Sequence, residues 1–429
     1  MRFEHAHVTI AVCQPSRSAL MTGRYPHRSG GEGFHHLRQP DLPIFPELLR
    51  QASYRVGILG KVTHSTPYSS FQWDMNHDMV ELGMGRNPKV YYQHATTFIQ
   101  DAKDRKQPFF LMANSHDPHR PFYGNDKTEW YTDQQQPPAS VPSRVFSADD
   151  VEMPSFLPDL PQVRLEIAEY YSSVRRCDDT LGKLLDILEE MGVVDNTLVI
   201  FLSDNGMAFP FAKTNCYLHS TKTPWIMRWP EHIKPNSVDK DHFISSIDLL
   251  PTVLEATGLE SPPDIDGFSF LPLLCNQQQE RRDKVFTQFH QTAGRQNYPM
   301  RCVQTKQFGY IFNPWSNGQR IFKNESQSGR TINAMRQASS EDQAIANRVQ
   351  FFLYRVPEEF YHFQNDPDAL HNLIDDPEHT EQIDNLRADL ESWMQLTHDP
   401  ALETFRNRYV RNALEEFINQ TTIFLGNYE

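Results

Sequence analysis

CQPSRSALMTGR, at residues 13–24, is the stretch of sequence around which this chain is organised. The apolar run VTIAV at 8–12 precedes it and predicts a short buried strand. Pro15 suits the first turn of a helix, because its φ is already helical and its missing N–H would be unpaired there anyway. We therefore expect Cys13 at a strand-to-helix corner, at the positive end of the helix dipole, where an anion is stabilised. Arg17, one turn further on, can point at the same place.

Length and composition are those of a soluble globular protein with one large and one smaller domain. The chain has 429 residues, of which 38% are hydrophobic and 22% charged. A net charge of −14 argues against general binding to nucleic acid or to an anionic membrane, so an anionic substrate must be bound by a local basic pocket. No apolar run approaches membrane-spanning length. The five cysteines form no CxxC pair and no disulfide framework, so they do not indicate a compartment.

Short apolar runs alternate with helical patterns over the first two thirds of the chain. This alternation predicts the α/β class, with a mostly parallel central sheet and helices on both faces. The expected strands are at 54–59, 108–113, 196–203 and 224–230, and the expected helices at 41–53, 89–104 and 162–191.

The character of the sequence changes after about residue 280. Residues 285–290 and 301–313 predict strands of a smaller antiparallel sheet, residues 314–350 are polar and indicate loops, and a terminal helix follows. We therefore predict a smaller C-terminal α+β domain. The expected domains are 1–280 and 281–429.

Polar residues follow each expected strand at its carboxyl end. That edge of an open α/β sheet is where ligands bind, so we expect the groups to meet there. They are Cys13, Lys61 with His64, His116 with His119, and Asp204 with Asn205.

Each of these groups also has a plainer interpretation. A lone cysteine is usually a buried structural residue, and Asp-Asn-Gly is a common turn. A single lysine is usually solvated. The histidine pair spaced three apart is compatible with a zinc ion, although no third ligand stands nearby on a helix face.

The pattern C-x-P-S-R-x-x-x-x-T-G-R at 13–24 resembles the signature of the sulfatase family. The similarity extends to HDPHR at 116–120, to TLVIFLSDNGMAFPFAKTN at 197–215, to NYPMRCVQ at 297–304 and to NDPDALHNL followed by LTHDP. These segments look like the sulfamidase (N-sulfoglucosamine sulfohydrolase) branch of the family and its bacterial relatives, whereas GKVTH and PYS lean toward iduronate-2-sulfatases.

The resemblance implies a specific chemistry. Cys13 would be oxidised by a maturation enzyme to formylglycine, whose hydrated aldehyde is the nucleophile of the family, beside one calcium ion. By the same resemblance, Lys61 and Lys213 contact sulfate, His64 orients the diol or relays a proton, and His119 contacts sulfate and protonates the leaving group. The calcium ligands would be Asp204, Asn205 and formylglycine 13, and the expected substrate-binding residues are His116, Arg120, His290 and Arg301.

The family pattern also places a strand that ends in a metal-binding Asp pair before the signature. Nothing upstream of Cys13 supplies such a pair, so we expect a truncated start and weak metal binding. No signal peptide is evident, while the family implies a periplasmic, secreted or lysosomal location.

The residues favour a hydrolase that removes sulfate from a sulfated saccharide. One alternative is a phosphatase or phosphodiesterase of the same superfold, which would require a Ser or Thr nucleophile and two transition metals. Another is a remnant that binds sulfated sugar without turnover. Zinc- or cobalt-dependent hydrolysis through the histidine pair is the third.

Overall fold

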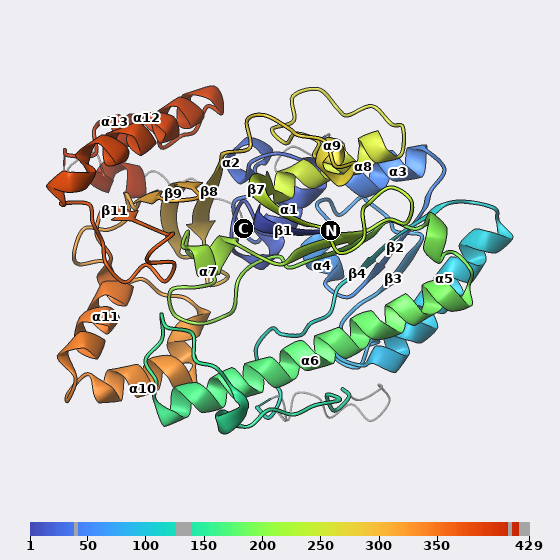
Figure 1. The fold of residues 1–429 in the computed structure, drawn as a ribbon, viewed down its shortest axis with the longest axis horizontal. Helices are drawn as coiled ribbons and strands as arrows, with labels where there is room; N and C mark the ends of the chain where they lie inside the picture. Colours follow the sequence, from blue (N-terminus) through green and yellow to red (C-terminus); the bar gives the residue numbers. More distant parts are fainter. Residues whose placement is uncertain (38–41, 126–138, 411–413, 420–429) are drawn as a thin grey trace.

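The central part of the protein is an α/β layer built from two groups of strands (Figure 1). The computed structural model describes residues 1–37, 42–125, 139–410 and 414–419. One group has the order β3-β2-β4, and the other has the order β5-β6-β1-β7. The strands are β1 Arg2–His7, β2 Arg55–Leu59, β3 Met75–His77, β4 Phe109–Ala113, β5 Val199–Leu202, β6 Trp225–Arg228 and β7 Val238–Ser245.

Helices cover both faces of this layer, which confirms the predicted α/β class. On one face, α5 (Pro88–Asp104) and α6 (Pro161–Glu190) share a hydrophobic cluster with β2 and β4. On the other face, α1 (Cys13–Thr22), α3 (Phe45–Gln51) and α8 (Leu249–Ala256) pack on the opposite side chains of β2, β4 and β5. The apolar runs predict packing on both faces, and side chains of these strands do pack on both, although those of β4 and β5 are only half-buried.

Strand direction is parallel in most pairs. Strand β2 pairs in parallel with β3 and β4, and β1 pairs in parallel with β7. The exception is β6, which runs antiparallel to both β1 and β5. Because parallel sheets commonly include an antiparallel strand, the apolar pattern alone does not fix this direction.

Strands β4 and β5 lie in one layer but belong to different sheets. Phe110 and Met112 of β4 contact the same cluster as Ile200 and Leu202 of β5. Within the described residues no ladder joins the two strands. A cavity of about 50 Å³ lies at their carboxyl ends, lined by Met112 and Leu202 and, on its polar side, by Arg17.

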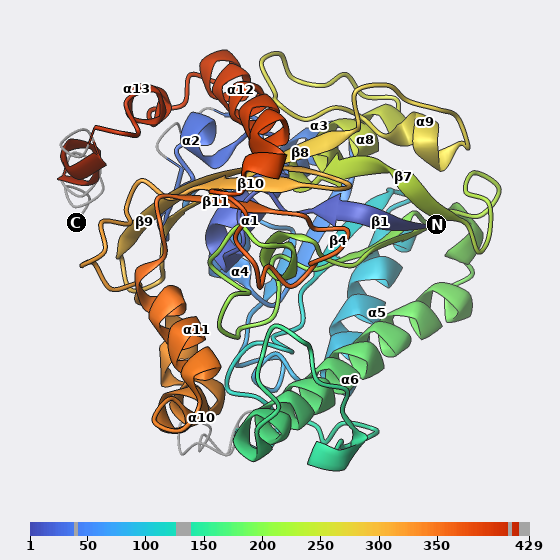
Figure 2. The same ribbon diagram turned by 60° about the vertical axis from the view of Figure 1, so that its left-hand side comes forward.

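The C-terminal sheet has the order β11-β10-β9-β8 and is antiparallel throughout, as predicted. Its strands are β8 Lys284–Gln291, β9 Asn297–Thr305, β10 Gly309–Phe312 and β11 Glu358–Tyr361. Helix α12 (Thr380–Leu396) packs on one face, as Figure 2 shows. The proposed boundary at residue 280 stays a prediction.

Two local expectations were wrong. The run 8–12 is buried but is not a strand: β1 ends at His7, and Thr9 turns to hydrogen-bond the hydroxyl groups of Ser245 and Ser246. The polar segment 314–350 contains two helices, α10 (Arg330–Ala338) and α11 (Gln343–Tyr354). The shorter helices are α2 Pro26–Ser29, α4 Val62–Ser65, α7 Leu218–Thr221, α9 Leu271–Leu274 and α13 Leu402–Arg406.

Across the described part of the chain, every helix is too short or too polar to span a bilayer.

Candidate active site

Cys13 is the first residue of α1 and lies buried at the helix N-terminus. The preceding residue, Val12, is extended and accepts a hydrogen bond from the Ser16 N–H (3.0 Å), and Gly23 ends the helix with φ +65°. The Cys13 Sγ is 3.8 Å from the Asn205 Oδ1. The N-terminal N–H groups of a ten-residue helix thus surround this position with positive potential.

The electrostatic surroundings of Cys13 favour an anion. Burial by itself raises the pKa of the Cys13 thiol, but the charge of Lys213 and hydrogen bonds with His119 and His64 hold that pKa well below its ordinary value, against an opposing effect of Asp204. A side chain that carries oxygen in place of sulfur would be stabilised by the same contacts. The position is therefore suited to an oxyanion or to the hydrate of an aldehyde, and formylglycine fits there.

Arg17 hydrogen-bonds side chains from three other segments of the chain. Its Nε and one Nη both donate to the Asp204 Oδ2 at 2.8 Å. Its other Nη donates to the Ser65 Oγ (3.0 Å) and the Asn114 Oδ1 (2.6 Å). The sequence indicated Arg17 and Asp204 but not Ser65 or Asn114, although Asn114 directly follows β4 and could have been found by that position.

Lys61 and His64 come from the turn after β2. Lys61 has φ +53° and caps α4, which carries His64 at its third position. Gly60 before it has φ +69°, and a Cβ there would lie 2.2 Å from the carbonyl oxygen of Asn114, so only glycine fits. Burial lowers the pKa of Lys61, against the opposing charges of Cys13 and Asp204. The ring of Phe34 packs edge-on against His64.

His116 and His119 lie in the loop after β4 and differ in their surroundings. Burial, assisted by the charges of Lys61 and Arg86, lowers the pKa of His116 to about 2, so this ring is neutral. The His119 Nδ1 is 2.6 Å from the carbonyl oxygen of Arg120, which can only accept, so Nδ1 is the donor. The other ring nitrogen of His119 is therefore the one directed to Cys13.

Lys213 is buried and holds a carboxylate that the sequence did not indicate. Its Nζ is 2.7 Å from the Oε1 of Glu325. Burial lowers the pKa of Lys213, but the charges of Cys13 and Glu325 outweigh this and raise it, so Lys213 is charged. Glu325 lies in the segment 314–350 that the sequence indicated as loops, and no pattern within that segment distinguishes it.

Asp204 and Asn205 offer too few ligands for a complete calcium site. Burial would raise the pKa of Asp204, but Arg17, Lys61 and Lys213 lower it to about 2, so it is a carboxylate surrounded by cations. Calcium takes about six to eight oxygen ligands. Over the described ranges, no three His, Cys, Asp or Glu side chains form a group that could hold a metal ion. These residues therefore do not by themselves fit a calcium ion.

The predicted substrate residues outside this cluster have other partners. Arg120 bonds the buried Glu166 (2.5 Å) and the carbonyl oxygen of Ala208 (2.8 Å). His290, in β8, lies 2.7 Å from the Gln288 Oε1. Arg301, in β9, is fully buried and makes a two-point ion pair with Asp399 (2.5 and 2.8 Å). The structure therefore gives Arg301 a place in the core, away from any accessible substrate surface.

We expect Asp399→Asn to lower the free energy of unfolding by about 3–5 kcal/mol at pH 7, because it leaves the buried Arg301 charge unpaired. Burial raises the pKa of Asp399, but Arg301 and His27 hold it below its ordinary value. A depressed carboxyl pKa contributes stability above the unfolded pKa of about 4, and this is lost as the pH falls through the folded pKa. Denaturant unfolding at pH 7 and pH 3 should therefore show a difference between wild type and variant that shrinks at pH 3; an equal difference at both pH values contradicts the pair.

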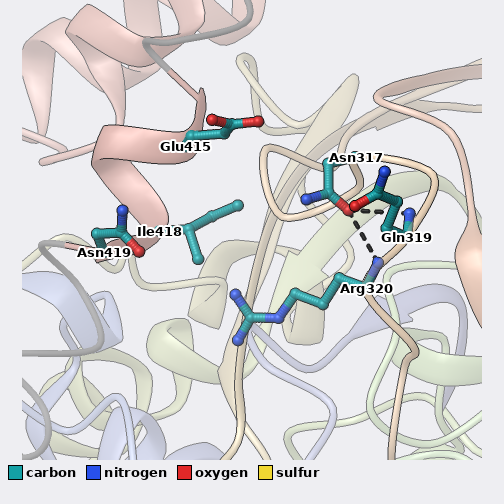
Figure 3. Close-up of a pocket in the computed structure, with 6 residues that line it drawn as sticks. All are labelled: Asn317, Gln319, Arg320, Glu415, Ile418 and Asn419. Atoms are coloured by element: carbon teal, nitrogen blue, oxygen red, sulfur yellow. Dashed lines mark hydrogen bonds between the residues drawn. The ribbon is translucent and has the colours of Figure 1, made fainter.

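A larger hollow of about 430 Å³ lies elsewhere, between the loop after β10 and residues near 415–419 (Figure 3). Asn317 accepts backbone hydrogen bonds from Gln319 and Arg320 there, and Arg320 donates to the carbonyl oxygen of Asn297 (2.8 Å). None of the residues grouped around Cys13 lines it. The candidate active site is therefore the polar cluster at the carboxyl edge of the central strands, as the sequence predicted.

Several known proteins resemble this chain in sequence over most of its length. A family profile described as sulfatase matches residues 1–259, and one described as the C-terminal region of N-sulphoglucosamine sulphohydrolase matches residues 208–325. The human protein named N-sulphoglucosamine sulphohydrolase is 31% identical over 428 residues, covering 93% of this chain and 84% of the human one. An ulvan-active sulfatase of Formosa agariphila is 29% identical, covering 92% of this chain and 73% of that protein.

Solved structures share the fold at low identity. One is described as bound to its substrate, D-glucosamine-2-N,6-O-disulfate; its TM-score is 0.68 at 19% identity, with 93% of this chain and 91% of that chain covered. Another is a phosphonate monoester hydrolase from Silicibacter pomeroyi, with a TM-score of 0.63 at 16% identity, covering 94% of this chain and 89% of that one. At these identities the likeness shows the fold alone.

Proposed function

This chain belongs to the sulfatase family, and from that premise we propose that it hydrolyses the sulfate group of a sulfated saccharide, either N-sulfoglucosamine or an O-sulfated sugar. One observation carries the proposal. The three cations Arg17, Lys61 and Lys213 all act on the buried carboxylate of Asp204, and Lys61 and Lys213 also act on Cys13, the first residue of a helix. Such an arrangement binds a tetrahedral oxyanion and stabilises the charge that develops on its oxygens in the transition state.

We assign the following roles to the side chains of the site. Formylglycine at position 13 supplies a geminal diol as the nucleophile for sulfur, after a maturation enzyme has oxidised the cysteine. Lys61 and Lys213 hold the sulfate oxygens, and Arg17 keeps Asp204 and Asn114 in place around them. His64 orients the nucleophile. His119 delivers the proton to the leaving group, because its Nδ1 is fixed by the Arg120 carbonyl and its other nitrogen faces position 13.

The family implies a divalent metal, and we expect calcium. Two oxygen-ligand residues, one of them already bonded by Arg17, do not complete such a site, so none of the steps above passes through the ion. The alternative function is a protein that binds sulfated sugar without turning it over. A phosphatase or phosphodiesterase shares the fold, but position 13 carries Cys where that chemistry uses Ser or Thr.

Sulfate release from N-sulfoglucosamine and from O-sulfated sugars tests the function. We expect release from protein in which mass spectrometry shows the aldehyde at position 13. Calcium should be supplied at about 10 mM, above the ~10⁻³ M dissociation constants of the weakest calcium sites. A parallel assay should contain a calcium chelator in place of the added calcium. Sugar binding without sulfate release, with aldehyde and calcium both present, contradicts hydrolysis and supports the binding protein.

A further inference from the structure

Glu325 places a carboxylate against Lys213, within electrostatic reach of His119, the residue assigned to the leaving atom. Its Oε1 is 2.7 Å from the Nζ of Lys213, and the charges of His119 and Arg120 also act on it. Its Oε1 is buried against Lys213, while the side chain as a whole is 28% exposed. Asp204, the other carboxylate in the cluster, accepts two hydrogen bonds from Arg17.

The backbone that carries Glu325 is firmly held. The side chain of Asn324 donates to the Thr214 Oγ1 (2.8 Å), next to Lys213, and the Lys323 N–H donates to the hydroxyl group of Tyr298 (3.0 Å). On the other side, a Cβ at Gly329 would lie 2.8 Å from the Arg120 guanidinium, so the chain passes as closely as glycine permits. The carboxylate is therefore delivered to a fixed place on the His119 side of the cluster.

The side chain of Glu166 also holds the segment after Glu325 in place. Its two oxygens accept the N–H groups of Arg330 (3.1 Å) and Thr331 (2.7 Å), and one of them also accepts from Arg120. The residue that follows His119 in the chain and the helix that follows Glu325 thus share one buried carboxylate. This fixes the relative position of His119 and Glu325.

Sulfamates and sulfate esters differ at the leaving atom in a way that a carboxylate can detect. Sulfamate hydrolysis, RNHSO₃⁻ + H₂O → RNH₃⁺ + SO₄²⁻, breaks an S–N bond, and the nitrogen carries hydrogen before the reaction and positive charge after it. Ester hydrolysis, ROSO₃⁻ + H₂O → ROH + SO₄²⁻ + H⁺, leaves an oxygen that has no hydrogen in the substrate and no charge in the product. A nearby carboxylate accepts from the first leaving atom and repels the lone pairs of the second.

We propose that Glu325 is a specificity-determining residue that accepts the N–H of the leaving nitrogen and so favours N-sulfated over O-sulfated sugar. This rests on the proposed function and specifies its substrate. Lys213 pairs with the carboxylate of Glu325 and interacts electrostatically with Cys13, and in the proposed function the same ammonium group binds sulfate. Selectivity follows because a site built to accept a hydrogen bond loses that bond with the analogue that lacks the donor.

The test compares two sugars that differ at one atom, N-sulfoglucosamine and glucose 2-sulfate. The ratio of their kcat/KM values is measured for wild type, Glu325→Gln and the control Glu341→Gln, which removes an exposed carboxylate in the turn after α10. We expect Glu325→Gln to lower the ratio, N-sulfated over O-sulfated, by about 10- to 100-fold, the range for one hydrogen bond with a charged partner. The control should leave the ratio unchanged.

A loss of equal size on both sugars, or no loss on either, overturns the proposal, because a carboxylate that merely pairs with Lys213 acts on both substrates alike. Calorimetry with glucosamine and glucose gives a second readout that needs no turnover: wild type should prefer the amine, and Glu325→Gln should lose that preference. If wild type releases sulfate from neither sugar, the proposed function fails, and the calorimetric comparison still decides the role of Glu325. Thermal unfolding of each variant checks that it is folded.

Discussion

Cys13→Ala is expected to reduce sulfate release by more than about 10³-fold, because removing the nucleophile of a covalent mechanism leaves only binding and charge stabilisation. Cys13→Ser should behave in the same way, since the proposed nucleophile is the hydrate of an aldehyde at this position. The helix should survive both changes. Its capping depends on backbone groups, and the Sγ, which lies 3.8 Å from the Asn205 Oδ1, caps no N–H group of the helix.

Two measurements separate this expectation from simple unfolding. Thermal unfolding and binding of inorganic sulfate should be nearly unchanged, because Arg17, Lys61 and Lys213 remain in place. Mass spectrometry of the peptide that spans residues 13–24 should show an aldehyde in active wild-type protein and none in the alanine variant. Activity in the alanine variant removes position 13 from the mechanism, whatever the rest of the site does.

The same corner shows how far the sequence could be used for prediction. Pro15 and the helical pattern after it place the start of α1, and the polar residues after each strand converge because the carboxyl ends of parallel strands share an edge. Arg17, Lys61 and Asp204 were foreseeable on that ground. The expected strand at 8–12 is absent, because apolar side chains are equally compatible with a buried turn, and Thr9 hydrogen-bonds the hydroxyl groups of residues far along the chain, its N–H donating to the Ser246 Oγ.

The features of the site that could not be predicted from the sequence depend on contacts between residues far apart in the chain. Arg301 is polar and lies in a segment that resembles the family, which indicated a substrate contact, yet its partner Asp399 is 98 residues away and buries it. No local pattern distinguishes Glu325 from the other polar residues of its segment. Its proposed role in specificity depends on the packing of η5 (Glu325–Ser328) and α10 against Glu166. A pattern of local residue types carries no record of such partners.

His119→Gln is expected to lower kcat/KM for a sulfated sugar by about 10²- to 10⁴-fold, the usual contribution of a general acid. The size should depend on the leaving group. A sugar hydroxyl or amine leaves poorly without a proton, whereas 4-nitrophenol leaves as a stable anion, so 4-nitrophenyl sulfate should lose much less than the sugar in the same variant. The measurement is kcat/KM for both substrates in wild type and variant.

His64→Gln is the matched control, because both histidines hydrogen-bond Cys13 but only one is assigned to the leaving group. If His64 orients the nucleophile, its loss slows attack on sulfur whatever leaves, and the two substrates should lose activity by the same factor. A leaving-group dependence in His64→Gln that is absent in His119→Gln would exchange the two roles. Equal losses in both variants would mean that neither ring delivers the proton. The assignment to His119 rests on the Arg120 carbonyl, which fixes the Nδ1 proton and so leaves a single nitrogen to face the substrate.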